Sequence, residues 1–262
     1  MPIVSANEIA KVLKLDKLGL LGNTIGSVLL KATKLSKINA IYETRKDLNG
    51  VQFIDSILKT LEVEFDIPEE DLKRIPKTGA FITVSNHPLG GIDGLILMKL
   101  LLAKREDYRI IANFLLHRLE PVKPYIMPVN PFEDHKEAKS SVGGLKEALS
   151  HLRDGKPLGM FPAGEVSTYK EDSVIADKPW EPSAMKLVQK ANVPIIPIYF
   201  KAKNSALFYR LSKLSPTLRT AKLPGEMLSQ KHRKIQVRIG HPISAKDQLE
   251  YKTLEDFTAY IR

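Results

Sequence analysis

Apolar residues recur along the chain with two periods, one typical of helices and the other of strands. Val51, Ile54 and Leu58 recur at three- and four-residue steps, which predicts one face of a helix. Residues 61–67 then alternate between apolar and polar, as in a half-buried strand. We predict further strands at 80–85, 108–112, 125–129, 158–161, 194–200 and 235–239. We predict further helices at 94–104, 137–153, 182–191 and 246–261.

Strands that alternate with helices predict an α/β fold, in which helices cover both faces of a mainly parallel sheet. Residues 202–232 are basic and lack a clear period, which indicates an irregular surface excursion or lid. The pattern divides the chain into an amphipathic helical N-terminal extension, residues 1–46, and one domain, residues 47–262.

The extension combines apolar and basic positions. Its apolar residues recur mostly at helical steps, with lysines between and beside them. The apolar ones are Leu13, Leu18, Leu21, Ile25, Val28, Leu29 and Leu35, and the lysines are Lys11, Lys14, Lys17, Lys31, Lys34 and Lys37. Such a stretch can lie in a membrane interface, with its lysines among anionic head groups. The alternative is a helix packed on the domain core.

The charge of the chain is concentrated in two segments. Forty Lys and Arg against thirty Asp and Glu give a net charge of +10. Residues 1–46 hold eight basic and three acidic residues, and residues 201–238 hold ten basic residues and Glu226 as the one acid. Such segments favour a polyanionic partner, although solvated surface lysines are the alternative. Aromatic residues make up only 7% and do not alternate with basic ones, so an anionic membrane is favoured over nucleic acid.

Several classes of protein are excluded or disfavoured. The 262 residues contain no cysteine, which rules out disulfides, iron–sulfur clusters and cysteine nucleophiles. The chain has neither a run of about 18 apolar residues nor the features of a signal peptide. We therefore expect a cytoplasmic protein that binds membranes peripherally.

The first chemical motif follows the predicted strand at 80–85. It reads Ser-Asn-His-Pro-Leu-Gly-Gly-Ile-Asp-Gly over residues 85–94. Asp93 can orient His87 as a base if the Pro and Gly residues fold the loop back. The alternative is a turn with an incidental histidine. No Gly-Lys-Ser/Thr follows, which excludes a P-loop, and no second His lies at metal-ligand spacing.

Two further motifs also follow or contain predicted strands. Residues 161–168 read Phe-Pro-Ala-Gly-Glu-Val-Ser-Thr, a loop whose carboxylate and hydroxyls can bind a polar acceptor. Residues 193–198 read Val-Pro-Ile-Ile-Pro-Ile, and the two prolines indicate an edge strand or the start of a strand.

In this order the three motifs resemble those of the lysophospholipid/glycerophosphate acyltransferase superfamily. The most similar branch is bacterial and haemolysin-like, and its members acylate lyso-aminolipids such as lyso-ornithine and lyso-glycine lipid. The match covers about residues 70–200, and the pairing of residues 86–94 with residues 161–167 is its specific part.

The resemblance implies an O-acyltransferase that needs no metal and no tightly bound cofactor. His87 would take the proton from the hydroxyl of a lyso-lipid as it attacks an acyl thioester, and Asp93 would orient the imidazole. Acyl carrier protein or coenzyme A would carry the acyl group. Backbone N–H groups of the glycine turn would stabilise the oxyanion. The substrate-binding residues implied are Asn86, Gly90, Gly91, Phe161, Pro162, Gly164, Glu165 and Ser167.

The motifs depart from the family pattern in ways that bear on the acceptor. Five residues instead of four separate His87 from Asp93, and the usual glutamate stands at Glu165 without a following arginine. This favours an ammonium head group, such as that of ornithine lipid, over a glycine carboxylate or a phosphate monoester. Lys170 or a base from residues 201–238 could replace the arginine, so 1-acylglycerol-3-phosphate is the second acceptor. A non-catalytic basic module is the alternative of another class and predicts a distorted or occluded His87–Asp93 pair.

Overall fold

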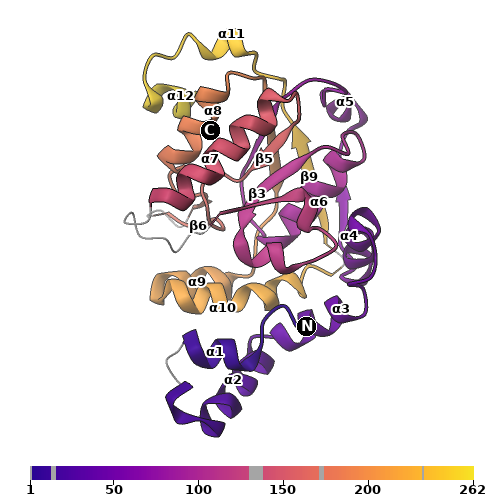
Figure 1. Ribbon diagram of the computed structural model, residues 1–262, viewed down its shortest axis with the longest axis vertical. Coiled ribbons are helices and arrows are strands. Elements are labelled where there is room, and N and C mark those ends of the chain that lie inside the picture. Colours follow the sequence, from indigo (N-terminus) through magenta and orange to yellow (C-terminus); the bar gives the residue numbers. More distant parts are fainter. Residues whose placement is uncertain (1, 13–15, 130–137, 171–173, 232) are drawn as a thin grey trace.

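The fold is built on a mainly parallel sheet. The computed structural model describes residues 2–12, 16–129, 138–170, 174–231 and 233–262. Within these residues, seven strands form one sheet in the order β1-β9-β8-β2-β5-β3-β4 (Figure 1). Its strands are β1 (Glu64–Asp66), β2 (Ile82–Ser85), β3 (Arg109–Asn113), β4 (Ile126–Val129), β5 (Leu158–Met160), β8 (Ile195–Lys201) and β9 (Lys234–Ile239). The β8–β9 pair is antiparallel and the other pairs are parallel, which confirms the predicted fold class.

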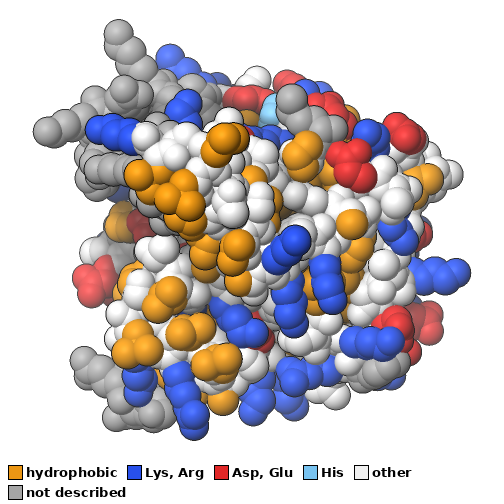
Figure 2. All heavy atoms as spheres, turned by 90° about the horizontal axis from the view of Figure 1, so that it is seen from below, with side chains coloured by type: hydrophobic (Ala, Val, Ile, Leu, Met, Phe, Trp, Pro, Cys, Tyr) orange, Lys and Arg blue, Asp and Glu red, His pale blue; other side chains and the backbone are white. Residues whose placement is uncertain are grey.

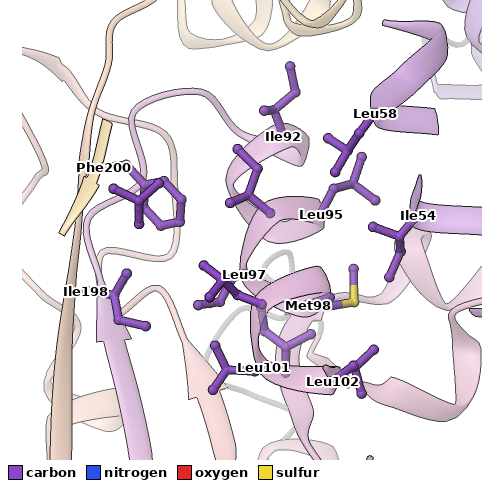
Figure 3. Packing of buried hydrophobic residues seen from close by; sticks show 14 of the residues in the cluster. Ile54, Leu58, Ile92, Leu95, Leu97, Met98, Leu101, Leu102, Ile198 and Phe200 are labelled. Atoms are coloured by element: carbon purple, nitrogen blue, oxygen red, sulfur yellow. The ribbon is translucent and has the colours of Figure 1, made fainter. Parts of the chain in front are cut away.

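Helices cover both faces of the sheet (Figure 1). On one face, α4 (Gly50–Thr60) packs against α6 (Gly91–Leu102), which is buried almost all round. Figure 3 shows Ile54 and Leu58 of α4 facing α6, while Ile198 and Phe200 of β8 lie on its other side. The other face is covered by α7 (Ala138–Arg153), α8 (Pro182–Ala191) and α12 (Leu254–Ile261). The sheet thus lies between two hydrophobic cores.

The N-terminal extension is helical. It forms α1 (Ala6–Val12), a 3-10 turn η1 (Asp16–Leu18), α2 (Leu20–Ala32) and α3 (Leu35–Glu43) at the foot of the molecule (Figure 1). Gly26 lets α1 and α2 touch, because a Cβ there would overlap the Ala6 carbonyl. The predicted positions Leu13 and Lys14 lie outside the described residues. No helix in the described part of the chain is both long enough and apolar enough to span a bilayer.

The prediction that residues 202–232 are irregular was wrong. They contain two helices, α9 (Ala206–Leu214) and α10 (Pro216–Met227). Each has a serine N-cap, because Ser205 accepts from the Phe208 N–H and Ser215 from the Leu218 N–H. Phe208 is fully buried and fixes α9 to the domain. These N-caps and buried aromatics were visible in the sequence, but the dense charge concealed the helical period.

Two helix boundaries and the position of one strand also differ from prediction. α6 begins at Gly91, earlier than predicted, because Asp93 caps its first turn. The closing helix is divided into α11 (Ala245–Gln248) and α12, because Thr253 ends the turn between them and caps α12. Of the two alternatives predicted from the prolines, the start of a strand holds for Pro194, which directly precedes β8, whereas β8 is an interior strand and not an edge strand. Pro197 lacks a backbone N–H but is tolerated in this interior strand. Its carbonyl accepts from the Gly240 N–H, one residue beyond the end of β9, so the absent N–H would also face a position outside the β8–β9 hydrogen-bond ladder.

The remaining elements are short and connect the larger ones. They are α5 (Glu69–Leu72), the 3-10 turns η2 (Phe114–Arg118) and η3 (Lys123–Tyr125), and a small antiparallel pair, β6 (Thr168–Tyr169) with β7 (Ile175–Ala176). The predicted first residue of α7, Glu137, is outside the described residues.

Candidate active site

The two chemical motifs meet because they follow neighbouring strands. β2 and β5 pair in parallel, so both end at the same edge of the sheet. Residues 86–90 form the turn after β2, and Phe161 begins the loop after β5. Ligands of open α/β sheets bind outside such strand ends.

His87 and Asp93 are in contact despite the additional residue between them. Nδ1 of His87 lies 3.2 Å from Oδ2 of Asp93, and the His87 side chain keeps 18% of its surface exposed. Gly90, with a φ of 79°, turns the chain back into α6. The same Oδ2 accepts from the backbone N–H groups of Leu89, at 2.7 Å, and Gly90, at 3.0 Å. The loop is therefore folded around the Asp93 carboxylate.

The electrostatic environment of Asp93 contains opposing effects. The side chain is fully buried, and this burial raises the pKa of the carboxyl above its ordinary value. The imidazole of His87 and the two backbone N–H donors act in the other direction. The carboxylate also lies in the first turn of α6, where the helix dipole favours a negative charge. The charged form of the Asp93 carboxylate is therefore stabilised by its contacts with the His87 imidazole and the two backbone N–H groups.

The second motif packs directly on the imidazole. The ring of Phe161 stacks on that of His87, with centroids 4.0 Å apart and an angle of 24° between the planes. The Ser167 N–H donates to the His87 carbonyl at 2.9 Å. One face of the imidazole and the backbone behind it are thus fixed by the loop after β5.

Two residues predicted to bind substrate, Asn86 and Ser167, use polar groups of their side chains for hydrogen bonds within the protein. Asn86 accepts from the Phe200 N–H at 2.7 Å and donates to the Phe200 carbonyl at 3.0 Å, which ties the ends of β2 and β8. The Ser167 hydroxyl is buried and donates to Asp177 at 2.5 Å. Pro162 also has a structural contact, because its carbonyl accepts from the Glu181 N–H.

Glu165 is paired with two bases, contrary to the expectation of an unopposed carboxylate. It contacts Lys178 at 2.6 Å and also Arg219 of α10, whose side chain is 8% exposed. Burial acts to raise the pKa of Glu165, but the bonds to Lys178 and Arg219 hold it below the ordinary value. A base from residues 201–238 does fold over the loop. The electrostatic reason to prefer an ammonium head group is therefore removed.

Helix α10 covers the turn that carries His87. A Cβ on Gly90 would lie 3.3 Å from Val166 and 3.5 Å from Leu223 of α10. Asn204, just before α9, donates to the Pro88 carbonyl at 3.0 Å. The small residue at position 90 thus allows a close approach, and the α9–α10 hairpin closes one side of the site.

A cavity of about 260 Å³ lies beside Asn86. Its wall includes Trp180 and three arginines, Arg74, Arg238 and Arg262. Arg74 and Arg238 both pair with Asp71, so the guanidinium groups are only partly neutralised. The wall is therefore rich in cationic side chains. Across the described residues, no three His, Asp or Glu side chains come together as a possible metal site.

Comparison with known proteins defines the class. An acyltransferase family model matches residues 20–262. The chain therefore belongs to this acyltransferase family and is an acyltransferase.

Two known enzymes are similar to this chain over most of its length. The lyso-glycine lipid O-acyltransferase of Bacteroides thetaiotaomicron is 28% identical over 244 residues, which cover 90% of this chain and 86% of the relative. The enzyme of the same name from Phocaeicola vulgatus is 26% identical over 234 residues, which cover 86% and 81%. The family match and these relatives confirm the resemblance drawn from the motifs. A crystal structure of the 1-acyl-sn-glycerophosphate acyltransferase PlsC from Thermotoga maritima has a TM-score of 0.47 and 18% identity, covering 91% of this chain and 84% of that one.

Proposed function

We propose that this acyltransferase moves a fatty acyl group from an acyl thioester to the hydroxyl of a lyso-lipid, with lyso-glycine lipid as the acceptor. The contact between His87 and Asp93 is the observation that carries the proposal. Two relatives named for that acceptor support it, each over more than four-fifths of the chain. The paired state of Glu165 is compatible with the glycine carboxylate, which an unopposed carboxylate would repel.

The proposed mechanism is a single acyl transfer with His87 as general base. Because Nδ1 faces Asp93, Nε2 is the nitrogen available to the acceptor. Nε2 takes the hydroxyl proton as the oxygen attacks the thioester carbonyl. The tetrahedral intermediate then collapses, the carbon–sulfur bond breaks, and the imidazolium returns the proton to the leaving thiolate. Asp93 stabilises the imidazolium between these steps.

The negatively charged oxygen of the tetrahedral intermediate, the oxyanion, is proposed to bind at the first turn of α6. The Gly90 N–H already donates to Asp93, so it is engaged. Gly91 is the first residue of α6, and Ile92 follows it. N–H groups at these positions have no partner within a helix, and the positive end of the helix dipole lies there. They are suitable donors to a developing oxyanion.

A peripheral membrane site completes the proposal. Large apolar side chains are exposed on α2 and its flanking turn and on α9 and α10, and we call these residues the lower face. They are Leu18, Leu20, Leu21, Val28, Leu207, Leu214 and Leu218. Figure 2 views the molecule from below, with hydrophobic side chains gathered among Lys and Arg. Such a surface suits insertion into an anionic bilayer, where the acceptor resides.

The test is acyl transfer by purified protein with matched acceptors. Lyso-glycine lipid, lyso-ornithine lipid and 1-acylglycerol-3-phosphate are each offered with acyl carrier protein and coenzyme A thioesters, and products are identified by mass. We expect turnover to be fastest with lyso-glycine lipid. His87→Ala should lower it by about 10²–10⁴-fold. His241→Ala, at an exposed position after β9, is the control. Preference for the phosphate acceptor, or full activity of His87→Ala, would contradict the proposal.

A further inference from the structure

We infer that Asp177 is a positioning residue that holds the backbone of His87, so that the imidazole stays between Asp93 and Phe161. The inference rests on the proposed role of His87 as the base. Asp177 lies outside both motifs, directly after β7, and is 7% exposed. It acts on the reaction through His87 and does not touch the substrate.

The carboxylate of Asp177 joins the two loops of the site. Its Oδ1 accepts from the His87 N–H at 3.2 Å and from the Ser167 hydroxyl at 2.5 Å. The Ser167 N–H donates in turn to the His87 carbonyl at 2.9 Å. The backbone N–H and carbonyl of His87 are therefore both hydrogen-bonded, the first to Asp177 and the second to Ser167. The imidazole is fixed at its base as well as at Asp93.

The segment that carries Asp177 is itself held on several sides. β7 pairs with β6, which follows Ser167 directly. Lys178 contacts Glu165, and the Glu181 N–H donates to the Pro162 carbonyl. Arg262 donates to the Asp177 carbonyl at 2.8 Å. The Asp177 carboxylate can therefore act as a fixed support for His87.

A rigid support matters because catalysis depends on small distances. A displacement of about 1 Å at a reacting group can lower the rate by about 10²-fold. Removing the carboxylate frees the His87 N–H and the Ser167 hydroxyl together. Asp177→Ala should therefore lower kcat by about ten- to hundredfold and leave the KM of both substrates within about twofold. Asp177→Asn keeps an oxygen that can accept both hydrogen bonds and should restore most of kcat.

A double-mutant cycle separates this role from general support of the fold. If Asp177 acts through His87, Asp177→Ala should cause no further loss of rate in a His87→Ala background. A multiplicative loss in the double variant would overturn the inference, as would unchanged kcat in Asp177→Ala. Thermal unfolding of all variants shows which ones remain folded at the assay temperature.

A second readout is independent of acyl transfer. The ring protons of His87 lie against the Phe161 ring, so their NMR signals carry its ring-current shift. Assignment uses the signal lost in the folded His87→Ala variant. We expect the His87 signal to move in Asp177→Ala and to stay in place in Asp177→Asn. An unmoved signal in Asp177→Ala refutes the positioning role even if no acceptor is turned over. Full activity of His87→Ala would instead refute the proposed base.

Discussion

The Asp93→Asn variant gives the sharpest test of the His87–Asp93 pair. The amide has nearly the shape of the carboxylate and can still accept from the Leu89 and Gly90 N–H groups. What it lacks is the negative charge facing Nδ1 of His87. The substitution therefore removes the stabilisation of the imidazolium with little change to the loop.

The size of the effect follows from the distance. Two unit charges 3.2 Å apart attract by about 5 kcal/mol at an effective dielectric of about 20. Partial exposure of His87 screens this attraction, so about 3–5 kcal/mol is the useful range. Each 1.36 kcal/mol changes a rate tenfold. We expect kcat/KM to fall by about 10²–10⁴-fold.

Stability should change in the opposite sense to activity. Burial raises the pKa of Asp93, so its contribution to stability is present at low pH and is lost as the pH rises through that raised value. An uncharged residue avoids this penalty. Asp93→Asn should therefore unfold at the same or a higher temperature at neutral pH. The raised pKa also affects the wild-type rate. When the pH is lowered, Asp93 should become protonated, and the rate should fall, at a higher pH than for an aspartate with an ordinary pKa.

Asp71→Asn is the matched control, because the Asp71 carboxylate is also buried but pairs with Arg74 and Arg238 and not with His87. Arg238 and the Ile239 N–H donate to its carboxylate, which lowers the pKa of Asp71. Its stabilisation is present above the ordinary aspartate pKa and is lost as the pH falls through the lowered value. This variant should lose about 1–3 kcal/mol of stability and keep its kcat. Acyl-transfer rates and thermal unfolding of both variants decide the matter. Near-normal kcat in folded Asp93→Asn would refute the mechanism.

Two further predictions concern the lower face and the core. Leu20→Ser should weaken binding to anionic vesicles about ten- to hundredfold in a sedimentation assay, because Leu20 is 87% exposed and burying a leucine is worth about 1.5–3 kcal/mol. Leu249→Ser, 74% exposed on α11's C-terminal side, should bind like the wild type, and equal losses would exclude a role for the lower face. Gly159→Ala should lose about 2–5 kcal/mol in denaturant unfolding, because the methyl group would overlap the Tyr108 hydroxyl. Gly144→Ala in α7, with open space around it, should gain up to about 1 kcal/mol, and similar behaviour of the two would refute the packing argument.

Periodicity predicted most of the domain because each core element buries one regular face. The predicted helix at 182–191 coincides with α8, and the strand at 235–239 differs from β9 by one residue. The motifs predicted the His87–Asp93 contact because both residues belong to one short loop at a strand end. Patterns of this kind are local, so each can be recognised within one continuous stretch of the sequence.

The parts of the site that were not predicted depend on contacts between distant segments. Asp177 shares no motif with His87, and only the folded chain brings its carboxylate to the His87 N–H. Arg219 is 54 residues from Glu165 and reaches it because α10 lies across the loop. A net charge of +9 over residues 201–238 described the segment without showing that this arginine is buried.

Helix α10 connects the lower face to the turn that carries His87. Leu218 is 51% exposed on this helix, whereas Arg219 is buried against Glu165. One turn further along, Leu223 lies over Gly90, in the turn that orients His87. A single helix therefore has exposed apolar surface on one side, and on the other it contacts the loops that carry His87 and Glu165. A bilayer that buries the exposed side would place its lipid hydroxyls beside the loops that α10 covers. His87, Asp93 and the covering helix α10 thus lie together at the strand ends.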